Sequence, residues 1–320
     1  MAISPAALTA ILLTDRSVPS DAPPLTASEF WPLVRSGELE VLAVDPSAAA
    51  TSGASAKVDR PRIEALLDRS TSVAFELDRL SQSGITVLSA LDESYPERLR
   101  LRLGDAAPPL LYTAGDASLL ENESLAIVGS RGVTEAGADV ARRAARAAIE
   151  NGLSVVSGGA KGVDQLAMLA AWEADGAVVG VLSEGLDRAL RSRENRAAVL
   201  DGRALLCSPY KPTAGFSTGN AMGRNKIVYA LASLALVVSS DEGSGGTWAG
   251  ATEALTKRYA VVAAWTGDGA GPGNAALVTR GATPVDDIAD LLAIRPETAA
   301  LRMLDRVATK STQLGLDLSL

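Results

Sequence analysis

The sequence LAIVGSRG at residues 125–132 joins a short apolar run to a glycine-rich turn. The same arrangement recurs as LSVVSGGAKGVD at 153–164, VVGVLSEGLD at 178–187 and LALVVSSDEGSGGT at 234–247. Apolar runs of this length, each followed by a helical pattern, are typical of strands in a parallel sheet that is buried on both faces. Glycine turns at the carboxyl ends of such strands leave backbone N–H groups and helix N-termini facing outward, where an anion can bind. The sequence therefore predicts an α/β fold with phosphate-binding turns at one edge of its sheet.

Strands and helices are expected to alternate from residue 116 to residue 295. Such alternation forces parallel strands with right-handed crossovers, so we expect an extended Rossmann-like, doubly wound, mostly parallel sheet. The expected helices are 135–151, 164–175, 195–200, 223–232 and 247–257, and further strands are expected at 85–88, 261–265 and 276–278 with 283–285.

The first 115 residues are predicted to form a small helical domain with an extended segment that connects it to the sheet. Apolar residues have helical spacing over 62–69 and 72–83, and a short helix is expected from Ala27, with Ser28 as its cap. The segment 46–57 is rich in Ala, Ser and Thr and is expected to be a loop. Residues 296–320 are expected to form a helical tail.

Composition excludes several classes of protein. The chain has 320 residues, one cysteine and no histidine, so catalysis through histidine, an intramolecular disulfide and a thiolate metal cluster are excluded. The cysteine, Cys207, lies in an apolar run and is expected in the core. The formal net charge is −8, so binding to nucleic acid would require a local basic patch.

The sequence also bears on location. No apolar run approaches the roughly 18 residues needed to span a bilayer. The N-terminus lacks a basic segment followed by a long apolar one, so no signal peptide is predicted. We expect a cytoplasmic protein without membrane contact.

The first candidate phosphate turn consists of Gly129, Ser130 and Arg131. The dinucleotide fingerprint G-x-G-x-x-G would require glycine at position 131, and no acidic residue ends the next strand, so no redox cofactor is expected. An arginine in this place is suited to bidentate phosphate binding. The alternative is an arginine that only extends along the start of a helix.

The second candidate turn follows the next strand and contains Ser157, Gly158, Gly159, Lys161 and Gly162. Its glycines allow a backbone to approach a ligand closely, and the lysine adds positive charge. The turn lacks the Gly-Lys-Ser/Thr order of a Walker A loop. Asp164 is expected to cap the following helix, a role compatible with phosphate binding in the turn.

Two further candidate sites lie at expected helix starts. Arg224, Asn225 and Lys226 are placed at the head of the helix expected over 223–232, where a cation opposes the helix dipole unless an anion binds there. Ser244, Gly245, Gly246 and Thr247 form another turn, although Thr247 as a plain N-cap is an equal alternative. A run of arginines at 188, 191, 193 and 196 is either a solvated helix face or part of a basic rim.

Taken together, these segments resemble the DNA-processing protein A family (DprA, also called Smf) over roughly residues 80–265. The matching elements include the Tyr95-Pro96 turn, the prolines at 108–109, the turns at 129–131 and 157–164, Gly185-Leu186-Asp187, Arg224-Asn225-Lys226 and Ser244-Gly245. The chain departs from the family pattern at Met168, where histidine is usual, and at Lys226, where arginine is usual.

The resemblance implies an extended Rossmann fold preceded by a small helical domain and assembled as a homodimer. It implies binding of single-stranded DNA in a basic pocket and loading of a RecA-type recombinase on incoming strands during natural transformation. Carried over to this chain, Arg131, Lys161, Arg224 and Lys226 would hold DNA phosphates. No cofactor, metal or membrane partner is implied.

Two other functions stay open at this point. Gly245-Gly246-Thr247 followed by Glu253 is similar to part of the motif of the Lonely Guy nucleotide phosphoribohydrolases, which would make the pocket a nucleotide site in an enzyme or a sensor. The third is a structural partner of recombination proteins without DNA binding. Without histidine or a carboxylate pair we expect no turnover, and Glu253 is the acid that would be tested first.

Overall fold

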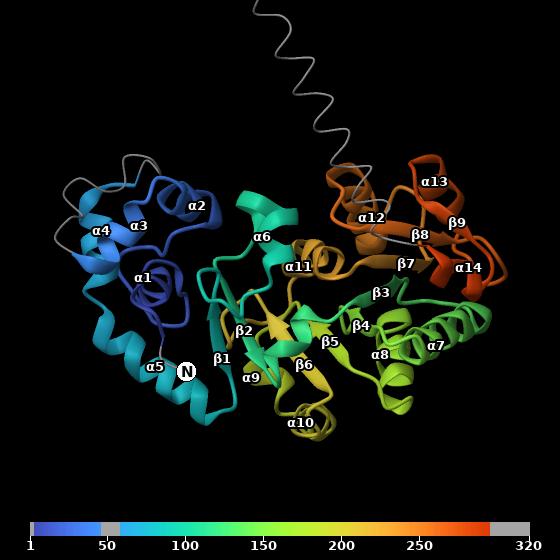
Figure 1. Cartoon of the computed structure of the whole chain (residues 1–320), viewed down its shortest axis with the longest axis horizontal. Helices are drawn as coiled ribbons and strands as arrows, with labels where there is room; N and C mark the ends of the chain where they lie inside the picture. The colour runs from blue at the N-terminus through green and yellow to red at the C-terminus, as the bar shows by residue number, and fades with distance from the viewer. Residues whose placement is uncertain (1–2, 46–57, 295–320) are drawn as a thin grey trace, which may run out of the picture.

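The computed structural model describes residues 3–45 and 58–294, and its centre is a nine-stranded sheet (Figure 1). The strands lie in the order β1-β2-β6-β5-β4-β3-β7-β8-β9. Their bounds are β1 Thr86–Ser89, β2 Leu110–Ala114, β3 Ser124–Gly129, β4 Ser154–Ser157, β5 Val178–Val181, β6 Ala204–Ser208, β7 Leu234–Ser239, β8 Val261–Trp265 and β9 Thr283–Val285. Strands β3 to β9 are parallel, whereas β1 and β2 are antiparallel, so the predicted doubly wound, mostly parallel fold class is confirmed.

The chain winds outward from β3 in both directions. It first passes through β4, β5 and β6, then returns through α11 (Thr218–Leu231) to β7, which pairs with the other side of β3. The strand order therefore reverses between β3 and β7. In open α/β sheets, ligands bind at such a switch point, outside the carboxyl ends of the strands.

Helices cover both faces of the sheet. Leu125 and Ile127 pack with α7 (Glu135–Glu150) and α8 (Val163–Glu173), whereas their neighbours Ala126 and Val128 belong to the core under α11. This alternation is the two-residue period of a strand buried on both faces. The remaining helices around the sheet are α6 Glu97–Leu103, α9 Leu186–Ala189, α10 Arg193–Leu200, α12 Gly245–Lys257, α13 Asn274–Thr279 and α14 Ile288–Ala293, with short 3-10 turns at Gly104–Ala106 and Ala117–Glu121. Within the described ranges, every helix is too short or too polar to cross a bilayer.

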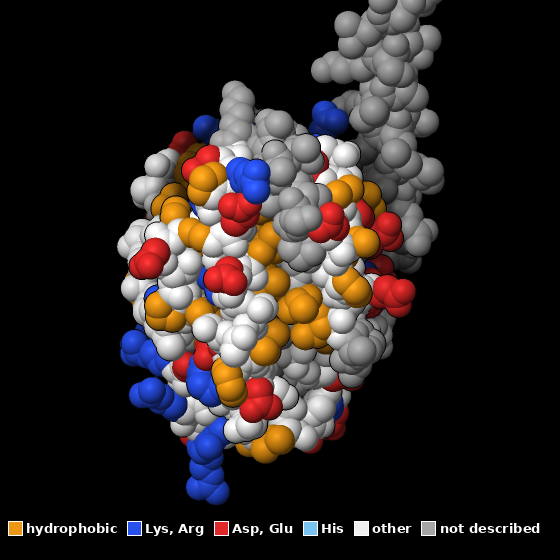
Figure 2. Space-filling model, turned by 90° about the vertical axis from the view of Figure 1, so that its left-hand side faces the viewer, with side chains coloured by type: hydrophobic (Ala, Val, Ile, Leu, Met, Phe, Trp, Pro, Cys, Tyr) orange, Lys and Arg blue, Asp and Glu red, His pale blue; other side chains and the backbone are white. Residues whose placement is uncertain are grey.

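Within residues 3–45 and 58–82, five α-helices precede the sheet in the chain and lie beside β1 (Figure 1). They are α1 Pro5–Thr14, α2 Ala27–Arg35, α3 Glu38–Val44, α4 Arg60–Leu67 and α5 Ser70–Gln82. Their outer face carries apolar patches among scattered charged side chains (Figure 2). Because β1 and β2 lie before residue 115 and still join the sheet, the sheet extends past the predicted boundary, and the division into domains stays a prediction.

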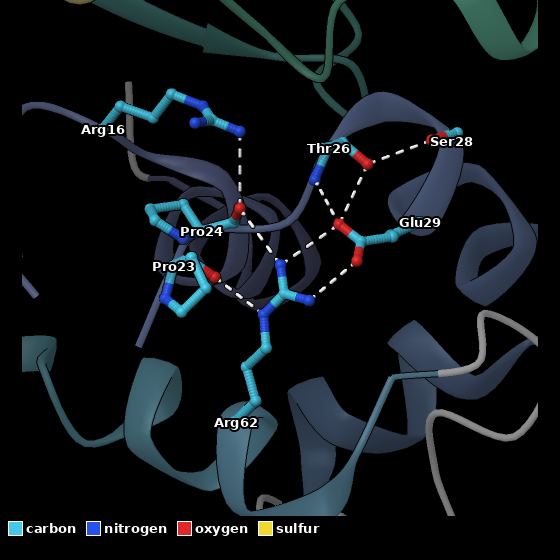
Figure 3. Close-up of polar contacts among 7 residues, drawn as sticks. All are labelled: Arg16, Pro23, Pro24, Thr26, Ser28, Glu29 and Arg62. Carbon is cyan, nitrogen blue, oxygen red and sulfur yellow. Dashed lines mark hydrogen bonds and ion pairs between the residues drawn. The ribbon is translucent and has the colours of Figure 1, made fainter. Parts of the chain in front are cut away.

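A salt bridge joins α4 to the start of α2 (Figure 3). Arg62 donates to both carboxylate oxygens of Glu29, at 2.7 and 3.1 Å, and to the carbonyls of Pro23 and Pro24. The Arg62 guanidinium lowers the pKa of Glu29 to about 2. The predicted cap Ser28 is wrong: Thr26 is the N-cap, and its backbone N–H donates to Glu29 (2.8 Å), three residues on.

Two elements of the sheet differ from the sequence expectation. Residues 276–278, predicted as a strand, lie in α13, because a short apolar run fits a buried helix as well as a strand. Strand β6 was not predicted, although its Cys207 is fully buried as expected and burial raises the pKa of this thiol to about 12. The predicted loop over 46–57 and the predicted tail over 296–320 lie outside the described residues.

Candidate functional site

A crevice of about 700 Å³ opens at the carboxyl ends of β3 and β7. This is the switch point of the sheet, where the β3–α7 turn, the start of α8, the first half of α11 and the start of α12 converge. Nine of the predicted site residues line it: Gly129, Ser130, Arg131, Arg224, Asn225, Ser244, Gly245, Gly246 and Thr247. The other six, Ser157, Gly158, Gly159, Lys161, Gly162 and Lys226, are not among its lining residues.

The turn after β4 packs against residues that line the crevice but does not line most of it itself. Ser157 is buried and its hydroxyl donates to the carbonyl of Ile127 at 2.6 Å. Gly158 lies against the guanidinium of Arg224, and Gly162, with φ of +85°, lies against the backbone of Ser130 and Arg131. A side chain at either glycine would displace these neighbours. The glycines therefore let the second turn pack against the first turn and Arg224.

Arg224 is on the floor of the crevice and is only 4% exposed. The sequence placed it at the head of a helix, and that placement is wrong. Helix α11 begins at Thr218, with Ser217 as N-cap accepting from the backbone N–H of Asn220, so Arg224 lies well inside the helix. The helix dipole acts mainly on the first turn, so the expected repulsion between the dipole and the charge of Arg224 does not apply at this position. What destabilises the charged form of Arg224 is burial, which lowers the pKa of its guanidinium.

The charge of Arg224 is only partly compensated. Its Nη1 lies 3.9 Å from Oδ2 of Asp164, too far for a hydrogen bond, and its buried Nε has no hydrogen-bond partner in the structure. Within the described residues, the guanidinium makes no hydrogen bond. A buried cation with unused donors is expensive unless a ligand supplies acceptors. The floor of the crevice is therefore suited to an anion.

Asp164 has a different role from the predicted helix cap. Helix α8 is capped by Gly162, and the Asp164 carboxylate accepts from the backbone N–H of Ala160 at 3.4 Å. Burial raises its pKa to about 6, against the opposing effects of Arg224 and of backbone N–H groups that include Gly129 and Gly158. Asp164 thus ties the first two turns together beneath the crevice.

The rim of the crevice holds a cation beside an aromatic ring. The Arg131 guanidinium lies 5.6 Å from the ring centre of Phe216, a geometry for a cation–π contact. Phe216 lines the crevice and is 51% exposed. Sequence reasoning missed it, although its position in the loop that leads to the Arg224 helix was a usable signal. Sequence reasoning also did not place Met222, Tyr229, Asp241 or Trp248 in the site.

The fourth turn closes the crevice on the side of α12. That helix begins at Gly245 with Ser244 as its N-cap, so Thr247 lies inside the first turn and is not the cap. Asn225 donates to the carbonyl of Gly246 at 2.9 Å, which fixes this turn to α11. The first N–H groups of α12 thus lie at the crevice, where a helix N-terminus favours an anion.

Glu253, the candidate acid of the phosphoribohydrolase alternative, is not among the lining residues. It accepts a hydrogen bond from the Tyr259 hydroxyl at 3.1 Å. The run of arginines at 188, 191, 193 and 196 does not line the crevice either. The Nε of Arg188 lies 3.5 Å from Oε2 of Glu184. The described residues contain no cluster of carboxylate and cysteine side chains arranged to hold a metal.

The model of the family DNA recombination-mediator protein A matches residues 86–295. This chain belongs to that family. The putative DNA processing protein DprA of Mycobacterium tuberculosis is 30% identical over 240 residues, which cover 68% of this chain and 60% of that protein. The DprA of Streptococcus pneumoniae is 33% identical over 158 residues, or 49% of this chain and 55% of that protein. The chain thus spans little more than half the length of these relatives.

Solved structures agree with the family assignment. The match to the X-ray structure of S. pneumoniae DprA covers 92% of this chain and 98% of the S. pneumoniae chain, with a TM-score of 0.69 and 25% identity. A Helicobacter pylori DprA, described for its single-stranded DNA binding mode, covers 64% of this chain and 93% of its own, with a TM-score of 0.53 and 23% identity. The second likeness shows the shared fold.

Proposed function

We propose that this DNA-processing family member binds single-stranded DNA, with a backbone phosphate in the crevice above Arg224. The observation that carries the proposal is the buried guanidinium of Arg224, which has no hydrogen-bond acceptor within the described residues. The nearby start of α12 adds backbone N–H donors, and Arg131 adds a second cation at the rim. Contacts of this kind hold a phosphate and carry no sequence information, so we expect little base preference.

The two cations face an acidic background. Asp164 and Asp241 also line the crevice, and the whole chain has a net charge of −8. Long-range attraction to DNA is therefore weak, and affinity has to come from local contacts. We expect binding that is strongly reduced by salt, because each phosphate neutralised by a cation releases counterions.

A mononucleotide is the second candidate ligand. The crevice volume lies within the range of about 300–1,000 Å³ that is usual for small-molecule sites. Against a hydrolytic enzyme is the position of Glu253, which is hydrogen-bonded to Tyr259 outside the crevice lining. A nucleotide sensor would not require this acid.

A titration separates the two ligands. Fluorescently labelled oligo-dT and a panel of nucleoside monophosphates are titrated against the protein at two salt concentrations. The proposal predicts oligo-dT binding that weakens steeply with salt, and mononucleotide binding that is weaker throughout. Tight mononucleotide binding with little response to salt, and no oligonucleotide binding, would assign the crevice to nucleotides.

From the family we further propose assembly as a homodimer, cytoplasmic location, and delivery of the bound strand to a RecA-type recombinase, as in natural transformation. The support is membership of the family, not a surface of this chain. Sedimentation tests the dimer. Strand exchange by a RecA-type protein, on strands coated by a single-strand-binding protein, tests the delivery. The proposal predicts that strand exchange is faster when this chain is added.

A further inference from the structure

A second hollow lies at the seam between the N-terminal helices and the sheet. It is small, about 90 Å³, and lies between the end of α1, the start of α2, the start of β2 and the residues after β6. Because β6 is parallel to β3 and β2 is antiparallel to β6, this hollow lies at the same edge of the sheet as the crevice.

Among the described residues, two cations line this hollow, and the two nearest carboxylates lie behind its lining: Asp15 accepts from Tyr112, and Glu29 accepts from Thr26 and is paired with Arg62. Arg16 follows α1, and Lys211 follows β6; both side chains are exposed. Within the described residues, Arg16 makes one hydrogen bond, a weak one of 3.4 Å to the carbonyl of Pro24, which also accepts from Arg62 (Figure 3). The planar group of Arg16 therefore keeps most of its five N–H donors available. In a chain with net charge −8, a hollow lined by two cations is a local positive patch.

A single loop connects the two hollows. The loop between β6 and α11, residues 209–217, contributes Pro209 and Lys211 to the hollow at the seam and Phe216 to the crevice rim. Phe216 is five positions after Lys211 in the chain, so their Cα atoms are at most about 18 Å apart. The turn in which the backbone N–H of Ala214 donates to the carbonyl of Lys211 (2.8 Å) shortens this separation, so at most about five nucleotides at about 3.4 Å each would span it.

The loop has a fixed position on the sheet. The backbone N–H of Gly185 donates to Ala214 at 2.8 Å, and that of Asp187 donates to Pro212 at 3.1 Å. Gly185 itself packs directly on the backbone of Lys211 and Pro212, where a β-carbon would not fit. The Gly-Leu-Asp segment after β5 thus holds the loop. The nearby acids are paired, Asp187 with Arg79 at 3.8 Å and Glu184 with Arg188 at 3.5 Å.

We propose that Arg16 and Lys211 form a second phosphate subsite, and that a DNA strand leaves the crevice across the 209–217 loop toward the N-terminal helices. This inference rests on the proposed single-strand binding and adds the path of the strand. The N-terminal helices then contribute directly to DNA binding. Strands too short to reach the seam gain nothing from these two cations.

The test uses the full chain with oligo-dT of about 4 and about 20 nucleotides, which bracket the usual site sizes of single-strand-binding folds. Arg16→Ala, Lys211→Ala and the double variant are compared with Lys257→Ala. Lys257 is an exposed lysine at the end of α12, at the opposite edge of the sheet. All three substituted side chains, Arg16, Lys211 and Lys257, are exposed, so the four variants are expected to fold, and thermal melts verify this.

Each seam substitution is expected to weaken binding of the long strand about twofold to fivefold and to reduce the salt slope by about 0.7. Binding of the short strand and all properties of Lys257→Ala should match wild type. If wild type binds both strands and the seam variants behave like Lys257→Ala, the second subsite is wrong and the crevice site stands. If wild type binds neither strand, the proposed function and this inference both fail.

Discussion

The guanidinium of Arg224 packs against the backbone of Gly158, with no room for a β-carbon between them. Gly158→Ala would therefore push Arg224 out of its place without removing its charge. We expect oligo-dT affinity to fall about tenfold, close to the value of one charge-assisted hydrogen bond. Gly219→Ala is the matched control in α11, since a β-carbon there meets only the Ser217 hydroxyl at 3.9 Å. Equal affinities of the two variants would mean that the position of Arg224 does not matter for DNA.

Asp164 should make stability fall as pH rises. Its folded pKa of about 6 is above its ordinary value of 3.8, so its stabilising contribution is present below about pH 4 and is lost as pH rises through about 6. Urea unfolding of wild type across this window should show the decline, and Asp164→Asn should lack it. Asp139→Asn, at an exposed residue on α7, is the control. A decline of equal size in Asp164→Asn would show that another group causes it.

The Glu29–Arg62 pair gives the opposite pH dependence. The folded pKa of Glu29 is lowered from 4.5 to about 2, so its contribution is present above about pH 4.5 and is lost as pH falls toward 2. At pH 7, Glu29→Gln should lower the free energy of unfolding by about 1–3 kcal/mol, and the difference should vanish in acid. Glu64→Gln, from the more exposed pair with Arg60, should cost less than about 0.5 kcal/mol. Equal losses of unfolding free energy in Glu29→Gln and Glu64→Gln at pH 7 would contradict a larger contribution from the Glu29–Arg62 pair.

Phe216 is expected to contact a nucleobase at the crevice rim. Phe216→Ala should weaken oligo-dT binding by roughly 1 kcal/mol or more, the usual loss for one stacked base. Phe75→Ala provides the control, because Phe75 is at least as exposed but lies on α5. An unchanged affinity in Phe216→Ala would limit the site to backbone contacts.

Much of the fold followed from the sequence, because the glycine turns after β3, β4 and β7 have a local signature. The period of the apolar residues also predicted α7 and α8 to within two residues at each end. Strand β6 and helix α13 were missed because short apolar runs do not distinguish strand from helix without their neighbours. The start of α11 was missed because Gly219 and Gly223 suggest a loop, while Ser217 caps the helix before them.

The site was harder to predict than the fold. Sequence spacing indicated which turns meet at one edge, but not that the turn at 157–162 supports Arg224 from behind. Burial of Arg224 depends on packing between α11 and this turn, which are distant in the sequence. Replacement of Arg224 therefore leaves Asp164 buried without its partner, and we expect a stability loss of up to about 3 kcal/mol, not the neutral effect of an exposed helix start.

The salt dependence of oligo-dT binding by wild type and Arg224→Gln, measured side by side on samples verified as folded, tests the central claim most directly. Arg224 at the crevice floor predicts weaker binding by the variant and a slope of log affinity against log salt that is smaller by about 0.7. A folded Arg224→Gln protein with the affinity and salt slope of wild type would contradict a phosphate site at this residue.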